Sequence, residues 1–189
     1  MGNKYIINYE NRCVEFFKPT GSIIVYKLPY EEVKKTILPI NIPNRFIVYI
    51  LVGVNDKKQE VIYVGKSKNG MDNRPTAHET DGIRWFYCYI LTTFSEKTFF
   101  NDAAIQYVEN RIYSDIKKSS RFVSLTKATN SNTISDFERE ICEEYLEEAY
   151  NMLYIGGLDL LPEIQNIEKE ENDIQVSDVC MVIQNLLTE

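Results

Sequence analysis

Apolar residues in the middle of the chain fall into three short and nearly continuous runs, at residues 46–52, 61–65 and 85–91. Their length and their β-branched and aromatic residues predict strands that are covered on both faces. Residues 53–60 are polar and rich in turn-forming types, so they predict a hairpin between the first two runs. A loop and then a short helix over residues 74–80 are expected before the third run.

The first 44 residues show a weaker pattern of the same kind. Short strands are predicted at three apolar segments separated by turn signals, at residues 5–7, 14–17 and 22–26. A short helix is expected after them, with Pro29 in its first turn, and then a proline-containing linker. We therefore expect residues 1–44 to form a β-rich N-terminal extension.

A long helix is predicted to end near Lys118, with Asn101 or Asp102 as its cap. At about 100° per residue, Glu109 lies about 40° from Ile105. Glu109 is therefore at the edge of the inward face, where a carboxylate needs a partner because burying an unpaired charge is costly. The apolar stripe of this helix consists of Ile105, Val108, Ile112 and Ile116.

A second long helix is predicted from Ser135 or Asp136 to about residue 153, ended by Gly156-Gly157. The residues expected on its inward face are Phe137, Ile141, Tyr145, Ala149 and Met152. The glutamates expected to face water are Glu140, Glu143, Glu144, Glu147 and Glu148.

The patterns together predict an α+β protein in four parts. They are an N-terminal extension, a central domain, an acidic helix packed on that domain, and a linker with a short C-terminal helix, at residues 1–44, 45–133, 134–162 and 163–189.

The formal net charge of −7 is unevenly distributed. Residues 122–189 carry 3 basic and 15 acidic side chains, whereas residues 45–121 carry 12 basic and 9 acidic ones. This asymmetry is compatible with a phosphate-facing core beside an acidic flank. It is equally compatible with a solvated acidic helix that has no further role.

Cysteine usage and hydropathy narrow the class of protein. None of the 4 cysteines forms a CxxC pair, and His78 is the only histidine, so a structural zinc site is not expected. Reduced thiols in a cytoplasmic protein are the expectation. The chain has no run of 18 apolar residues and no signal-peptide core at its start, so no membrane association is expected.

Side chains able to act on a phosphodiester come from different elements around the predicted sheet. A single carboxylate can hold a hard divalent cation, and an arginine can contact a phosphate through two hydrogen bonds. A tyrosine or a histidine can take a proton from water. Each such residue alone more often has a structural role. The hypothesis of phosphodiester chemistry therefore depends on the whole ordered set. The set consists of Tyr49, Tyr63, Arg74, His78 and Glu109.

The order of these residues resembles the GIY-YIG nuclease family. That family's pattern is a strand ending Gly-Ile-Tyr, a hairpin to Tyr-Ile-Gly, a basic residue, an Arg-x-x-x-His step and a helical glutamate. In this chain Ile47-Val48-Tyr49 takes the first place without the leading glycine, and Tyr63-Val64-Gly65 takes the second. Lys66 follows as the basic residue, and the resemblance covers about residues 45–130.

Arg74 and His78 match the Arg-x-x-x-His step, and Glu109 matches the helical glutamate. The resemblance implies a small three-stranded antiparallel sheet flanked by helices. It also implies an endonuclease that hydrolyses phosphodiester bonds in DNA with one Mg²⁺ or Mn²⁺ ion, bound by Glu109. RNA stays open as a substrate.

The resemblance also implies roles for the other matching residues. Tyr49 is implied as the general base or as the group that orients the water, with assistance from His78. Tyr63 is implied as a contact to the phosphate or the water. Arg74 is implied as the clamp on the scissile phosphate, and Lys66 as a further positive charge beside it.

One part of the family pattern is less well matched, and two other functions stay open. The downstream asparagine of the family falls near Thr126 here, with Asn130 and Asn132 a little further on. The same fold could instead be a weak or inactive module that binds nucleic acid or protein. A structural subunit is the third reading. The oligomeric state is left open, with a homodimer among the options.

Overall fold

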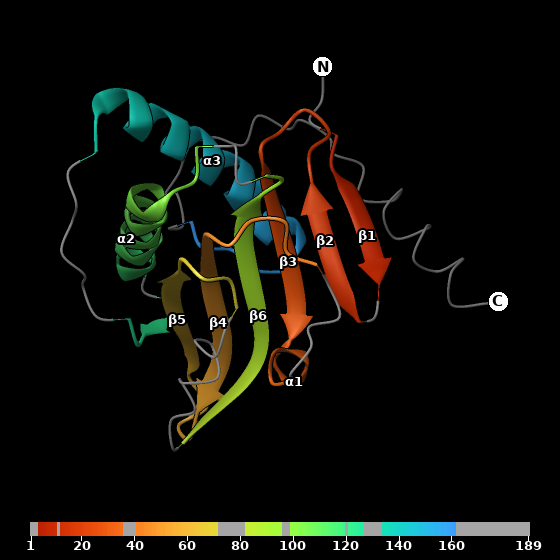
Figure 1. Ribbon diagram of the computed structural model, residues 1–189. Coiled ribbons are helices and arrows are strands. Elements are labelled where there is room, and N and C mark those ends of the chain that lie inside the picture. The colour runs from red at the N-terminus through yellow and green to blue at the C-terminus, as the bar shows by residue number, and fades with distance from the viewer. Residues whose placement is uncertain are drawn as a thin grey trace, which may run out of the picture.

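The computed structural model describes residues 4–10, 12–35, 41–71, 82–95, 99–119, 121–126 and 134–161. The strands are β1 (Ile6–Glu10), β2 (Cys13–Phe17), β3 (Ile23–Pro29), β4 (Ile47–Asn55), β5 (Glu60–Ser67), β6 (Ile83–Thr93) and β7 (Val123–Ser124). The helices are α1 (Tyr30–Val33), α2 (Asp102–Lys118) and α3 (Asp136–Ile155). The protein is therefore α+β, as the sequence predicts, with all strands in one sheet (Figure 1).

The sheet contains 7 strands in the order β1-β2-β3-β6-β4-β5-β7. Adjacent strands are antiparallel except β5 and β7, which are parallel. β6, β4 and β5 are antiparallel neighbours, but the implied three-stranded sheet is wrong, because these strands belong to a larger one. β3 pairs along its 7 residues with β6, so the N-terminal strands continue the same sheet. The apolar pattern of a strand fixes its buried faces and not its neighbours, which is why the sequence did not reveal this.

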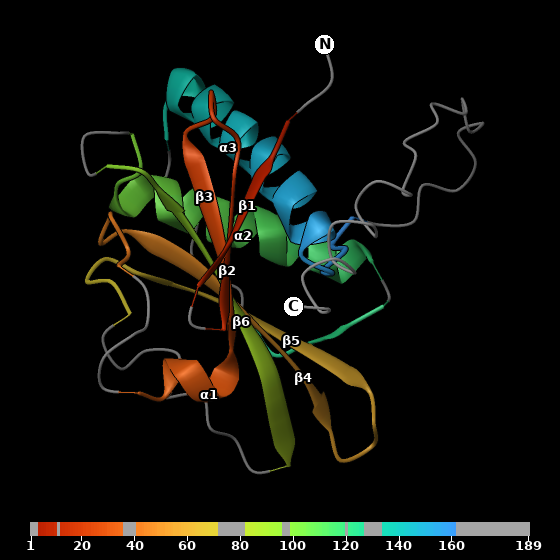
Figure 2. The same ribbon diagram turned by 90° about the vertical axis from the view of Figure 1, so that its right-hand side faces the viewer.

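Period-two alternation along the strands divides the interior into two cores. The helix-side core includes Val48, Ile50, Ile62 and Val64 from the sheet and Ile105, Val108, Ile112, Leu146 and Leu153 from the helices. The α1-side core on the other face includes Ile47, Tyr49, Leu51, Trp85 and Cys88 together with Tyr30 and Val33 of α1. Figure 2 shows α2 and α3 lying together across the sheet, with α1 apart from them.

The two long helices begin and end as the sequence predicts. The Asn101 side chain accepts hydrogen bonds from the backbone N–H groups of Ala103 and Ala104, both at 3.0 Å. Ser135 and Glu138 form a reciprocal capping box at the start of α3, and Gly156 caps its end. The first residue of the expected inward face of α3 is wrong, because Phe137 is 71% exposed. It lies in the first turn, ahead of the part of the helix that packs on the sheet.

Some expectations fall on parts of the chain that the structure does not describe. The expected short helix over residues 74–80 and the expected C-terminal linker and helix over residues 163–189 lie outside the described residues. Among the described helices, none has the length and hydropathy needed to cross a membrane.

The cap of α2 gives a test of the fold. Replacing Asn101 by Ala removes the acceptor for two backbone N–H groups, so we expect the free energy of unfolding to fall by about 1 kcal/mol. Asn101→Asp keeps a capping oxygen and is expected to match the wild type. Urea denaturation measures both, and equal losses for the two variants would show that the side-chain cap is unimportant.

Candidate active site at the end of strand β5

Tyr49 and Tyr63 lie next to each other on the α1-side face of the sheet. In the ladder between β4 and β5, Tyr49 is opposite Gly65 and Leu51 is opposite Tyr63, so the two tyrosines are diagonal neighbours. Their ring centroids are 6.1 Å apart and their planes are tilted by 31°. Tyr49 is buried and Tyr63 is partly exposed, so Tyr63 is the member of the pair that reaches solvent.

Gly65 is required by the position of the Tyr49 ring. A Cβ atom at residue 65 would lie 2.5 Å from both Cζ and Oη of Tyr49 and 2.9 Å from Cε1 of Tyr63. These separations are far below van der Waals contact, so any side chain here displaces the rings. The glycine of the Tyr63-Val64-Gly65 signature therefore lets the hydroxyl end of Tyr49 lie directly on the backbone of β5.

Thr126 fixes the same strand from its outer edge. The backbone N–H of Val64 donates to the Thr126 hydroxyl at 2.7 Å, and that hydroxyl donates to the carbonyl of Val64 at 3.2 Å. β7 pairs with β5 only at Val61 and Ile62, so Thr126 continues the pairing by one step. The residue near which we expected the family's asparagine is thus a structural clamp on β5.

Lys66 and Glu109 form an ion pair between β5 and α2. Lys66 Nζ lies 3.1 Å from Glu109 Oε2, and the two side chains are 22% and 8% exposed. The sequence predicts that Glu109 lies at the edge of the inward face and needs a partner, and Lys66 is that partner. A carboxylate this buried requires such compensation, because its desolvation would otherwise cost several kcal/mol.

The structure places the tyrosine pair and the ion pair on opposite faces of the sheet. Lys66 is opposite Val48 in the ladder, and Val48 belongs to the helix-side core. Tyr49 belongs to the α1-side core. The two pairs therefore meet at neighbouring residues of β5, Gly65 and Lys66, with the thickness of one strand between them.

The remaining residues of the expected site lie outside the described residues. Arg74 and His78 fall between Met71 and Gly82, in a segment outside the described residues. Asn130 and Asn132 lie in residues 127–133, which are also outside the described part of the chain.

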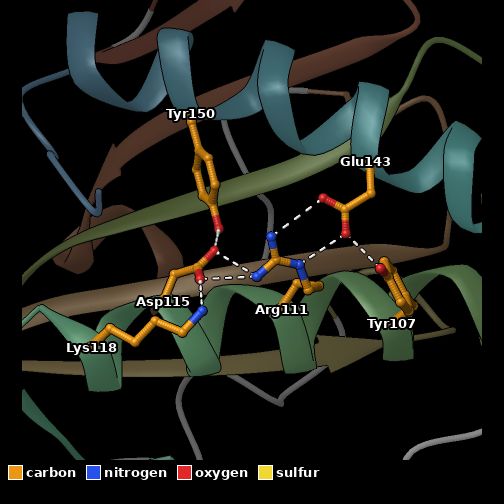
Figure 3. A network of polar contacts seen from close by, with 6 residues as sticks. All are labelled: Tyr107, Arg111, Asp115, Lys118, Glu143 and Tyr150. Atoms are coloured by element: carbon orange, nitrogen blue, oxygen red, sulfur yellow. Dashed lines mark hydrogen bonds and ion pairs between the residues drawn. The ribbon is translucent and has the colours of Figure 1, made fainter. Parts of the chain in front are cut away.

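A polar network between α2 and α3 was not predicted from the sequence (Figure 3). Asp115, 6% exposed, accepts hydrogen bonds from Arg111 at 2.9 and 3.1 Å, from Lys118 at 3.1 Å and from the Tyr150 hydroxyl at 2.8 Å. Arg111 also reaches Glu143 at 2.9 Å. The spacing of Arg111 and Asp115 by four residues is a sequence signal for their contact, whereas the contacts with α3 have none.

Glu143 was expected to face water, and its contacts in this network correct that expectation. It accepts a hydrogen bond of 2.5 Å from the Tyr107 hydroxyl as well as those from Arg111. Burial pushes the pKa of Glu143 upward, but the hydrogen bonds from Arg111 and Tyr107 outweigh it and leave the pKa lowered. Burial and the contact with Glu143 raise the pKa of Tyr107 to about 12. The network thus joins α3 to the helix that carries Glu109.

The donor set around Glu109 permits one type of metal site. Among the described residues, no group of three or more His, Cys, Asp or Glu side chains could hold an ion. Mg²⁺ keeps several waters and is often bound through only one or two carboxylates. Of the expected site, Glu109 is the carboxylate that the structure describes, and its Oε2 is engaged by Lys66.

Comparison of the chain with protein-family models, with curated proteins and with solved structures finds no match.

Gly65 gives the first test of this geometry. Gly65→Ala forces a methyl group against a buried ring, and we expect a loss of about 1–3 kcal/mol in the free energy of unfolding. Tyr49→Leu removes the atoms that clash, so the same glycine substitution is expected to cost less in that background. An unchanged cost in the two backgrounds, measured by urea denaturation, would contradict the packing of Tyr49 on Gly65.

The polar network gives a test that depends on pH. Because the folded-state pKa of Glu143 is lowered, its contribution to stability is present above the unfolded-state pKa of about 4.3 and is lost as the pH falls through the folded-state value. We expect Glu143→Gln to lower the thermal midpoint near neutral pH and to flatten its decrease between about pH 5 and pH 3. Glu144→Gln, at an exposed neighbour, should keep the acid dependence of the wild type, and a similar flattening there would contradict the assignment.

Proposed function

We propose that this protein is a divalent-metal-dependent endonuclease that hydrolyses phosphodiester bonds in DNA, with a GIY-YIG-like site at the end of β5. The observation that carries the proposal is the meeting of two specialised pairs at Gly65 and Lys66. The tyrosine pair needs a residue without a side chain at position 65. The ion pair of Lys66 and Glu109 holds a carboxylate on a side chain that is 8% exposed.

The end of β5 is the place where one substrate could contact both faces of the sheet. β7 pairs with β5 at Val61 and Ile62 only, and the Thr126 hydroxyl takes the next outward-facing backbone groups, at Val64. Because backbone hydrogen-bonding groups alternate in direction along a strand, those of Lys66 are the next to face this outer edge. A phosphodiester backbone lying across this end of the strand would meet the tyrosines on one side and the ion pair on the other.

Each side chain of the site has a proposed role in the hydrolysis. Tyr63, the partly exposed member of the pair, holds the attacking water or the phosphate, and Tyr49 orients it or takes the proton of the water. Lys66 supplies positive charge to the phosphate oxygens. Glu109 would hold one Mg²⁺ or Mn²⁺ ion, which when bound stabilises negative charge that develops on the phosphate and the leaving oxygen.

Arg74 and His78 are included in the proposed site because of their places in the sequence. Arg74 would clamp the scissile phosphate through two hydrogen bonds, and His78 would assist the proton transfer. The cytoplasm is the proposed setting, which is supported by the described cysteines, Cys13, Cys88 and Cys142, because all three are buried free thiols.

The alternative is a module with the same fold that binds nucleic acid or protein and has little or no activity. The separation of the tyrosine pair from the Lys66–Glu109 pair favours it. In that case the Lys66 ammonium is the permanent cation of Glu109, and the ion pair is structural.

A plasmid-nicking assay separates the two functions. We expect purified protein to nick supercoiled plasmid with Mg²⁺ or Mn²⁺, and Glu109→Gln to slow the reaction by at least about 100-fold because the anchor for the cation is lost. Tyr49→Phe is expected to lose about 100-fold as well, since the hydroxyl acts on the water. Glu140→Gln, at an exposed glutamate of α3, serves as the matched control and should nick normally. No nicking with either metal, or equal rates for wild type and Glu109→Gln, would sink the catalytic proposal.

A further inference from the structure

Strand β6 contains an irregularity that exposes two neighbouring aromatic residues. In its pairing with β4, Tyr87 is opposite Val52 and Trp85 is opposite Gly53. Phe86 is therefore the extra residue of a β-bulge, since two positions on β6 correspond to one step on β4. Bulges of this kind redirect side chains. The burial of the neighbouring residues shows which face of the sheet Phe86 and Tyr87 occupy.

The bulge turns both aromatic residues to the helix side of the sheet. Trp85 and Cys88 both lie in the α1-side core, although residues three apart on a regular strand point to opposite faces. The two residues between them are consequently directed away from that core. Phe86 is 37% exposed and Tyr87 is 41% exposed, so this part of the sheet presents two adjacent rings to solvent.

A cation lies over each of these rings. Lys27 Nζ is 4.4 Å from the centroid of the Tyr87 ring, and Arg84 Cζ is 5.4 Å from the centroid of the Phe86 ring. Lys27 is held in place by a hydrogen bond of 2.7 Å to the carbonyl of Gly156. Each ring therefore has a cation within cation–π distance, and both residues stay partly exposed.

Basic side chains lie beside the rings, and the end of α3 adjoins them, since its C-cap Gly156 accepts the hydrogen bond from Lys27. The lower part of β6 extends past α2 and α3 in Figure 1. Arg84 is opposite Val54, which places the tip of the β4–β5 hairpin beside it. That tip carries Lys57 and Lys58 together with Asp56, and Glu60 of β5 also lies opposite Val54.

We propose that Phe86 and Tyr87, together with Lys27 and Arg84, form a binding platform for single-stranded nucleic acid. Bases stack on the two rings, and the lysine and arginine attract the phosphates. A duplex keeps its base faces stacked on each other, so the rings select an unpaired strand. This inference takes its ligand class from the proposed nuclease function, and the platform lies on β6, away from the Gly65–Lys66 site.

The binding experiment uses fluorescence anisotropy with the whole 189-residue chain in EDTA. The probe is a labelled single-stranded DNA of about 15 nucleotides, long enough for one site, and the comparison is the duplex of the same sequence. We expect the single strand to bind at least tenfold more tightly than the duplex. Equal affinity for the two probes, or no binding of the single strand, would overturn the platform.

Substitutions locate the site. Phe86→Ala combined with Tyr87→Ala is expected to weaken single-strand binding by at least about tenfold, from the loss of two stacking faces. Phe86→Trp combined with Tyr87→Trp keeps the rings and should retain the affinity, which controls for damage to the fold. Phe137→Ala removes an aromatic residue that is 71% exposed on α3 and is expected to bind as the wild type does. Affinity of the Phe86/Tyr87 alanine variant within twofold of the Phe137 control would refute the assignment.

The salt dependence of binding tests whether the basic side chains contact phosphates. Nicking assays distinguish the platform proposal from the nuclease proposal. Arg84→Gln should lower the slope of log affinity against log salt by about 0.7, the loss of one phosphate contact on a single strand; an unchanged slope would remove Arg84 from the platform. Glu109→Gln is expected to bind the single strand normally. Normal binding with no nicking by the wild type would defeat the nuclease proposal alone, whereas nicking without single-strand binding would defeat the platform alone.

Discussion

The Tyr49 ring can lie against the backbone of β5 because residue 65 has no side chain. This close approach fixes where the hydroxyl of a buried tyrosine points, and it brings the partly exposed Tyr63 ring to a centroid distance of 6.1 Å. Thr126 holds the same strand from the outer side through both backbone groups of Val64. The geometry of the candidate site therefore depends on one glycine contact within a strand that is fixed at both of its edges.

The charged half of the site depends on the placement of α2. The apolar stripe of α2 packs on the helix-side core, and Asn101 caps its start. The network of Arg111, Asp115 and Glu143 then joins α2 to α3. Glu109 is carried on this fixed helix, so its carboxylate meets Lys66 with little freedom to move. Such rigidity suits a site that must hold charges in place before substrate arrives.

The sequence predicted the elements of the site better than their arrangement. The 3.6-residue period located α2 and the partly inward position of Glu109, and the caps Asn101 and Ser135 marked the helix starts. Local patterns of this kind are set by nearby residues. The pairing of β3 with β6 and the contacts of Glu143 join residues far apart in the chain, and hydropathy does not encode them.

The placement of Tyr63 and Lys66 on opposite faces of the sheet has a signal in the sequence. Tyr63 and Lys66 are three residues apart on one strand, so period-two geometry already places them on opposite faces. The structure confirms this through the opposition of Lys66 to Val48 and of Tyr49 to Gly65. The prediction that Phe137 faces inward was wrong for another reason. Helical periodicity does not show where along a helix the packing begins.

Whether the two faces of β5 act on one phosphodiester can be measured by a double-mutant cycle in the nicking rate. The variants are Tyr49→Phe, Lys66→Met and the combination of the two. Groups that act as a unit give strongly non-additive losses, so we expect the double variant to be about as slow as the slower single variant. Losses that multiply, or a single variant with the wild-type rate, would contradict the claim that the two pairs form one site.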